Sequence, residues 1–207
     1  MQRSLRRLAG VLGTASAFSA LTLAASPVAA QADLLSVNAC DNSALSQPFT
    51  QWLDPNSYKL APGGDFEGGP SWSLRGGAAV GSGSESFAVT GSAGSSSLSL
   101  PAGSSATSPP TCVNAAYPSF RLFARSDDPG ATVAVSVVYN TGLGNVTIPV
   151  GTLLSSSDWQ PTLPMLTGSA VAGLLSGGTA NVSLRFVAGG GTTQIDDVYV
   201  DPHSRCC

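Results

Sequence analysis

Charged residues are scarce in this sequence, and basic residues are the scarcest. Only 10% of the 207 residues are charged, against about 25% in an average chain, and Lys59 is the single lysine. Because no cluster of lysine and arginine follows residue 7, the sequence excludes a basic nucleic-acid-binding surface. The hydrophobic fraction of 43% is also too high for an intrinsically disordered chain.

Catalytic motifs are lacking as well. No Gly-x-Ser-x-Gly nucleophile motif occurs, and the single histidine, His203, lies in the C-terminal tail outside the predicted domain. A glycosidase needs two carboxylates that face each other across a cleft. The Asp127-Asp128 pair precedes Pro-Gly, which is typical of a turn. The sequence therefore predicts that the protein is not an enzyme.

The first 32 residues have the three parts of a secretory signal peptide. Residues 3–7 carry three arginines, Leu8–Ala25 is an apolar stretch, and Ala30-Gln31-Ala32 fits a small-residue cleavage site. We expect residues 1–32 to be removed, so that the mature protein is secreted and keeps no stable insertion in a membrane. An uncleaved membrane anchor and a twin-arginine signal are the alternatives.

Residues 33–207 are predicted to form one domain with a short, cysteine-containing C-terminal tail. This part keeps six basic residues and all twelve acidic ones, which gives a formal charge of −6. An acidic protein does not favour anionic lipid or nucleic acid as a partner. A domain of this size can bury a core of its own, and we expect a monomer.

The four cysteines all lie in the exported part, where disulfides persist. No Cys-x-x-Cys motif occurs, which argues against a structural zinc site. Of the three pairings we favour Cys40 with Cys112, because the adjacent Cys206 and Cys207 can bridge each other only through a strained ring. The tail cysteines are then available for intermolecular bonds, or one of them replaces a member of the favoured pair.

Alternation of apolar and polar residues dominates the mature sequence, and helical periods are almost absent. Turn sequences separate the short runs at spacings of about 8–12 residues, which is typical of an antiparallel sandwich or barrel. Residues 101–110 are predicted to form a surface connection, and only Met165–Ser176 is predicted to hold a short helix. The predicted strands are residues 58–60, 71–76, 87–90, 97–100, 119–125, 131–139, 145–150, 160–163, 179–187 and 194–200.

The two most distinctive segments lie near the ends of this region. Residues 60–69 read LAPGGDFEGG and are followed by Trp72, and residues 194–201 read QIDDVYVD. The first resembles the turn before a tryptophan strand in jelly-roll carbohydrate-binding modules, and the second resembles their closing strand. Ser95–Leu100 and Phe120–Arg125 lie where those modules have inner strands.

The resemblance covers residues 58–201 and extends to secreted proteins of high-GC bacteria with a galactose-binding-like layout. It implies an all-β fold, an antiparallel β-sandwich of the jelly-roll type. In these modules the Asp-Phe-Glu turn and an aspartate of the closing strand commonly hold a structural calcium ion. The resemblance maps the ligands to Asp65, Glu67 and Asp196, with a backbone carbonyl near Ser96. A family resemblance transfers the fold better than the ligand.

The alternation by itself predicts that Asp196 points inward. Asp196 shares a face with Val198 and Val200, whereas Asp197 and Tyr199 fall on the opposite face. A buried carboxylate is costly unless it is paired or bound to a metal, and calcium takes oxygen ligands from carboxylates and carbonyls. The alternative is that Asp196 accepts backbone hydrogen bonds or pairs with an arginine.

Aromatic side chains beside polar groups are the usual platforms for sugars. Trp72 and Trp159 are predicted to pack in the interior, while Trp52 and Tyr117 lie in loop-like sequence and are the predicted ligand-binding residues. The sequence therefore predicts a secreted, non-catalytic module that recognises a polysaccharide or a cell-envelope glycan. The alternative is a structural or adhesive extracellular protein with no small ligand, whose sheet face would lack an exposed aromatic pair.

Overall fold

The computed structural model describes residues 44–69, 71–114, 119–141, 144–166 and 179–201, all within one unit, Ala32–Cys207. These ranges form strands and one short 3-10 helix, η1 (Thr50–Trp52), and no helix in them has the length and apolar character of a membrane span. The strands are β1 (Lys59–Leu60), β2 (Ser73–Arg75), β3 (Ala79–Ser82), β4 (Ser96–Leu100), β5 (Ser105–Thr107), β6 (Thr111–Asn114), β7 (Ser119–Arg125), β8 (Thr132–Thr141), β9 (Gly144–Leu154), β10 (Gln160–Pro161), β11 (Met165–Leu166), β12 (Thr179–Ala188) and β13 (Thr193–Asp201).

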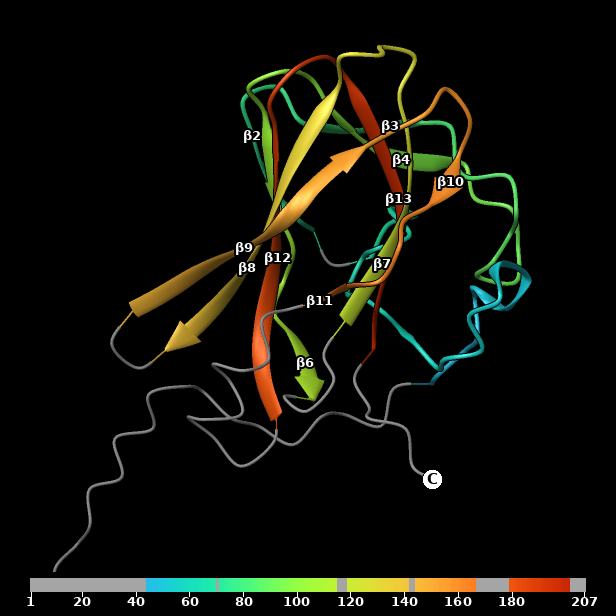
Figure 1. The fold of residues 1–207 in the computed structure, drawn as a ribbon, viewed down its shortest axis with the longest axis vertical. Helices are drawn as coiled ribbons and strands as arrows, with labels where there is room; N and C mark the ends of the chain where they lie inside the picture. Colours follow the sequence, from blue (N-terminus) through green and yellow to red (C-terminus); the bar gives the residue numbers. More distant parts are fainter. Residues whose placement is uncertain (1–43, 70, 115–118, 142–143, 167–178, 202–207) are drawn as a thin grey trace, which may run out of the picture. The chain divides into compact units, whose positions relative to one another are not determined.

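The strands form two antiparallel sheets, which are separate layers in Figure 1. The seven-stranded sheet has the order β10-β7-β13-β4-β3, with β1 added to β13 and β11 added to β7. The six-stranded sheet has the order β2-β5-β12-β8-β9, with β6 added to β12. The predicted fold, an all-β antiparallel sandwich of the jelly-roll type, is confirmed.

The main core lies between the two sheets. It is built from alternate residues of the strands, so that Val133, Val135, Val137 and Tyr139 of β8 are all buried in it. These residues are β-branched or aromatic, and such side chains pack well on a pleated surface. The residues between them in β8 are half-buried or exposed, which is the pattern of a sheet with one packed face.

A second, smaller core covers the outer face of the seven-stranded sheet. Phe123 of β7 and Tyr199 of β13 point outward there and are covered by Phe49 and Tyr58 from the segment before β1. Phe49 stacks on Phe123 with ring centroids 5.7 Å apart and meets Tyr58 edge-on at 5.0 Å. The seven-stranded sheet is therefore packed on both faces.

Three predicted segments differ from the structure. Phe87–Thr90 forms no strand, because the N–H groups of Phe87 and Val89 donate to the Glu85 carboxylate instead of to a neighbouring strand. The predicted surface connection contains β5, which pairs with β2 and β12. The predicted helix begins as β11 at Met165, and its remaining residues, 167–176, lie outside the described residues.

The closing strand β13 changes partner along its length. Its first half pairs with β4 and its second half with β1, while β7 pairs along its other edge. The register with β7 shifts between Asp196 and Tyr199, which is a β-bulge. Ile195 and Val198 consequently both face the main core, whereas Asp196 lies opposite Phe123, on the outer face. The prediction that Asp196 shares the face of Val198 is wrong, because the alternation does not run through the bulge.

Candidate functional site

Three acidic side chains, those of Glu85, Asp196 and Asp197, are buried where β13 bulges. Asp196 Oδ2 accepts hydrogen bonds from Ser84 Oγ and from the backbone N–H of Glu85, both at 2.8 Å. Its Oδ1 accepts from the backbone N–H of Asp197 at 2.9 Å. Asp197 has a φ of 45°, in the left-handed region, and is 4% exposed rather than facing solvent.

The environment of Asp196 and Asp197 favours the neutral forms of their carboxyl groups. Burial raises the pKa of Asp196 to about 6, although hydrogen bonds from Glu85, Ser84 and Asp197 act in the opposite direction. The pKa of Asp197 is raised by burial first, and then by the negative charges of Asp196 and Glu85. Carboxylates this close repel one another unless a proton or a cation lies between them.

Two of the predicted calcium ligands, Glu67 and Ser96, are neighbours in the structure. The Glu67 carboxylate accepts hydrogen bonds from the backbone N–H groups of Ser95 and Ser96, at 2.5 and 2.6 Å, and from Ser95 Oγ at 2.9 Å. These bonds, the one from the Ser95 backbone above all, lower the pKa of Glu67. Asp65 Oδ1 accepts from the backbone N–H of Glu67 at 3.3 Å, which fixes the turn.

Gly94 lies between Glu67 and the serine that contacts Asp196. A side chain at residue 94 would collide with both Glu67 Oε1 and Ser84 Oγ, and Ser84 in turn donates to Asp196. On β4, Ser97 Oγ is buried and has no hydrogen-bond partner. Carboxylate and hydroxyl oxygens are ligand types that calcium takes, although those of Glu67 and Asp196 accept N–H and O–H hydrogen bonds here. Within the described ranges, no three His, Cys, Asp or Glu side chains are positioned to hold a metal ion.

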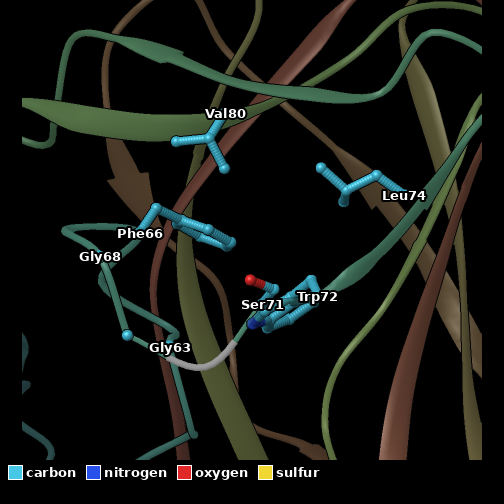
Figure 2. A pocket seen from close by; sticks show the side chains of 8 residues that line it. Gly63, Phe66, Gly68, Ser71, Trp72, Leu74 and Val80 are labelled. Atoms are coloured by element: carbon cyan, nitrogen blue, oxygen red, sulfur yellow. The ribbon is translucent and has the colours of Figure 1, made fainter.

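Figure 2 shows a pocket of about 250 Å³ between β2 and β3, to which those strands contribute Leu74 and Val80. Phe66 and Trp72 form its aromatic wall, with ring centroids 5.3 Å apart, and Ser71 lies at its edge. Trp72 is buried in the main core, as predicted, and its indole N–H donates to the Pro62 carbonyl at 3.1 Å. The pocket is thus lined mainly by carbon and has few donors for a sugar.

A second cavity, a polar groove of about 430 Å³, lies at the end of β7. Ser99 of β4, Gln194 of β13 and Arg125 of β7 are register partners across three adjacent strands of the seven-stranded sheet. They lie on its outer face, because the residues that flank them in each strand face the main core. We call this cavity the polar groove; its lining residues are Ser99, Arg125, Ser126, Asp127, Asp128, Thr192 and Gln194.

Arg125 connects the two sides of the polar groove. Its Nε donates to Gln194 Oε1, and its Nη2 donates to Asp127 Oδ2 at 3.2 Å. Because a guanidinium can only donate, Gln194 has to turn its carbonyl oxygen to Arg125. The NH₂ group of Gln194 is then the end that remains for a ligand. The groove therefore holds both hydrogen-bond donors and carboxylate acceptors.

Hydrogen bonds fix the loop between β7 and β8 that carries the two aspartates. Ser126 Oγ donates to the Thr192 carbonyl at 2.7 Å, and the Ser126 backbone N–H donates to the Ser156 carbonyl at 2.7 Å. Asp128 Oδ1 accepts from the backbone N–H of Gly130 at 2.9 Å, which closes the turn that the sequence predicts there. A groove held in this way loses little conformational freedom when a ligand binds.

Trp159 lies beside the polar groove. The Arg125 Cζ atom is 5.9 Å from the centroid of the Trp159 ring, within the range of a cation–π contact. The ring is half-buried against the second core, so the predicted packing role of Trp159 holds for part of its surface. An aromatic surface and planar hydrogen-bonding groups are therefore adjacent at this end of the sheet.

The residues predicted to bind ligand fall elsewhere. Trp52 is half-buried and packs edge-on against Phe87 at 4.9 Å and Phe123 at 5.3 Å. Tyr117 lies outside the described residues. Cys112 is buried in β6 and disulfide-bonded, and no other cysteine lies in the described ranges, so the pairing with Cys40 stays a prediction.

The outer face of the six-stranded sheet carries small and polar side chains. On β8 and β12 the outward residues include Ser136, Val138, Ser183 and Arg185, which pair across the two strands. None of the outward residues described on this sheet is aromatic, since the aromatic residues of its strands, Tyr139 among them, face the main core. This face offers no stacking platform for a sugar ring.

Sequence reasoning missed the polar groove. Arg125 and Gln194 look like ordinary strand residues, and the two aspartates look like turn residues. The signal that was present is that Arg125 and Gln194 both occupy outward positions of their strands. It becomes informative only when the register places them side by side.

The fold and the site define a β-sandwich with a polar groove on one sheet. No protein-family model and no curated protein matches the chain. Among solved structures, it is similar to a family 22 xylan-binding domain from Paenibacillus barcinonensis, at 14% identity and a TM-score of 0.44, over 69% of this chain and 93% of that one. It is also similar to a family 11 carbohydrate-binding module of a Clostridium thermocellum cellulase, at 10% identity and a TM-score of 0.43, over 73% of this chain and 98% of that one.

A third similar structure contains two modules of xylanase 10B from Clostridium thermocellum, complexed with xylohexaose. The identity is 13% and the TM-score 0.43, over 72% of this chain. The match spans only 28% of the xylanase chain. These neighbours include carbohydrate-binding modules with a β-sandwich fold.

Proposed function

We propose that this chain is an exported, non-catalytic carbohydrate-binding module and that its sugar site is the polar groove. The observation that supports it is the row Ser99, Gln194 and Arg125, which meets the Asp127 carboxylate beside Trp159. Sugars carry hydroxyl groups that donate and accept, and they bind planar amide, guanidinium and carboxylate groups next to an aromatic surface. The signal peptide predicted in residues 1–32 supports export.

Polysaccharide binding by variants of the groove, compared with a control variant on the other sheet, tests this site. We expect Arg125→Ala and Gln194→Ala to weaken binding by at least about tenfold, since each removes hydrogen bonds made by the groove. The measurement is affinity electrophoresis of the mature protein through gels containing xylan, galactan, mannan or β-glucan. Arg185→Ala is the matched control, because Arg185 is an exposed strand arginine on the six-stranded sheet.

The outcomes separate the two faces of the sandwich. Loss of binding in Arg185→Ala, with binding retained in Arg125→Ala, would move the site to the six-stranded sheet. If the unaltered protein binds none of the polymers, the carbohydrate proposal fails. Melting temperatures of the variants should equal that of the parent, which shows that lost binding is not lost folding.

The aromatic-free outer face of the six-stranded sheet favours a second candidate, a structural or adhesive surface protein with no small ligand. Its described outward side chains offer hydrogen-bonding groups but no ring on which a sugar could stack. This candidate predicts no binding to any soluble polymer in the same gels. It is the conclusion to which a uniformly negative result would lead.

We also propose that Asp65, Glu67, Asp196 and a carbonyl near Ser96 come together around a structural calcium ion when it binds, since the three carboxylates do not converge on one point in the described structure. The buried carboxylates around Asp196 support it, because a cation would relieve the repulsion between them. The Ser97 hydroxyl, next to Ser96 on β4, is a further oxygen without a hydrogen-bond partner. When bound, calcium would tie the turn before β2 to the closing strand and so stabilise the folded chain.

Thermal melting with calcium chloride and with a chelator tests the ion. Calcium at a hundredfold excess over its Kd should add about 2.7 kcal/mol to the free energy of unfolding. Asp196→Ala should abolish that response, whereas Asp158→Ala, on an exposed loop, should keep it. A melting temperature that neither calcium nor chelator changes would leave Asp196 with only its hydrogen-bonding role in the fold.

A further inference from the structure

The net charge of the polar groove does not favour the anionic sugar that its arginine alone would attract. Arg125 is the only basic residue that lines the groove, and by itself a strand arginine would favour anionic sugars such as uronates. Asp127 and Asp128 line the same groove, so its formal charge is −1.

The Asp127 carboxylate forms an ion pair with Arg125. Its Oδ2 accepts from Arg125 Nη2 at 3.2 Å, and the side chain of Asp127 is 76% exposed, so it lies at the mouth of the groove. Arg125 is more enclosed, with a side-chain exposure of 33%. A ligand that approaches from solvent therefore meets the carboxylate together with the guanidinium.

A sugar hydroxyl and a uronate respond to this pair in opposite ways. A hydroxyl can donate to the carboxylate and accept from the guanidinium at the same time. The carboxylate of a uronate can only accept, so it has to compete with Asp127 for Arg125, and it is repelled by Asp127 and Asp128 as it approaches. Discrimination against a partner commonly rests on such an unfavourable pairing.

From this we infer that Asp127, by pairing with Arg125 at the mouth of the polar groove, makes the site select sugars without negative charge over uronates. The inference rests on the proposed function of the groove and names its ligand class. The amide of Gln194 and the hydroxyl of Ser99 then supply neutral hydrogen bonds, which do not distinguish the two classes. Asp128 adds to the repulsion of a uronate, but only Asp127 also competes with it for Arg125.

Polygalacturonate and its methyl ester are the matched probes, since they share one backbone and differ in charge. We expect the mature protein to bind the methyl ester more tightly than polygalacturonate. Asp127→Asn should shift the ratio of the two affinities toward polygalacturonate by at least about tenfold, the value of one charge-assisted hydrogen bond. The shift should shrink in 0.5 M salt, because it is electrostatic.

Two variants control for charge in general. Asp158→Asn makes the same charge change outside the groove and should leave the ratio unchanged. Adding Arg125→Gln to Asp127→Asn should remove the shift, because no guanidinium remains to receive the uronate. Circular dichroism and melting temperature establish that each variant is folded.

The results distinguish this inference from the proposed function. If the parent protein binds both pectin polymers equally, or if Asp127→Asn does not shift the ratio, the role of Asp127 is refuted while carbohydrate binding stands. If the parent binds neither pectin polymer but binds a neutral polymer of the earlier panel, the ratio is measured between that polymer and its carboxymethylated form. If it binds no polymer, both proposals fail together.

Discussion

Asp54→Ala should destabilise the protein by about 3–5 kcal/mol, since it leaves a buried arginine without its partner. Asp54 Oδ2 accepts hydrogen bonds from Arg121 Nη1 and from the Tyr58 hydroxyl, both at 2.7 Å. Arg121 is 4% exposed and its Cζ lies 4.2 Å from the centroid of the Phe49 ring, so little solvent reaches the guanidinium to replace the lost carboxylate. Urea unfolding followed by tryptophan fluorescence measures the loss.

Two further variants show whether the loss in Asp54→Ala comes from a buried, unpaired charge. Asp127→Ala breaks the exposed ion pair with Arg125 and should cost no more than about 1 kcal/mol. Replacing Asp54 by leucine and Arg121 by methionine together should recover much of the loss, because an apolar pair leaves no buried charge. A cost below about 1 kcal/mol for Asp54→Ala would show that the segment before β1 is not held by this pair.

The same pair gives the stability an acid dependence. Burial alone would raise the pKa of Asp54, but hydrogen bonds from Tyr58 and Arg121 outweigh it and hold the pKa below its ordinary value of 3.8. A depressed pKa in the folded state means that this stabilisation is present above about pH 4. It is lost as the pH falls through the folded-state pKa. Asp54→Asn should lack that part of the acid dependence.

Phe123→Ala should destabilise the protein by about 3–5 kcal/mol, although Phe123 points away from the main core. Its ring is fully buried on the outer face of the seven-stranded sheet and packs against Phe49, Trp52 and Phe87, with centroid distances between 5.3 and 5.7 Å. Leu53→Ala, in the same covering segment, should change stability by less than about 0.5 kcal/mol because Leu53 is 94% exposed.

Differential scanning calorimetry of both variants measures the two effects. A small loss for Phe123→Ala would mean that the segment before β1 lies loosely on the sheet. The second core would then contribute little to folding. Equal losses for Phe123→Ala and Leu53→Ala would contradict the burial pattern as a guide to stability in this region.

Much of the sandwich could be predicted from local alternation. Val133, Val135, Val137 and Tyr139 recur at every second position of β8, so one face of this strand had to be buried whatever its partners were. The same reasoning failed at β13, because the bulge inverts the alternation after Asp196. It also failed at residues 87–90, where the Glu85 carboxylate takes the backbone donors.

The candidate sites followed the sequence only in part. The resemblance predicts that the Asp-Phe-Glu turn lies close to Ser96, and in the structure the Ser96 backbone N–H donates a hydrogen bond to Glu67. Glu85 and Asp197 gave no signal, because their burial depends on a loop that packs over the bulge. For the polar groove the outward positions of Arg125 and Gln194 were the only signal, and it was not enough, because the groove is assembled from β4, β7, β13 and two loops.

The sequence by itself determined the secondary structure class, since a period of two residues with glycine and proline punctuation permits strands and little else. It also determined the low charge, and it predicts an export signal in residues 1–32. The tertiary structure alone decided which polar side chains meet, because strand register is a long-range property. Arg125 and Gln194 are 69 residues apart in the chain, and only the pairing of β7 with β13 makes them one site.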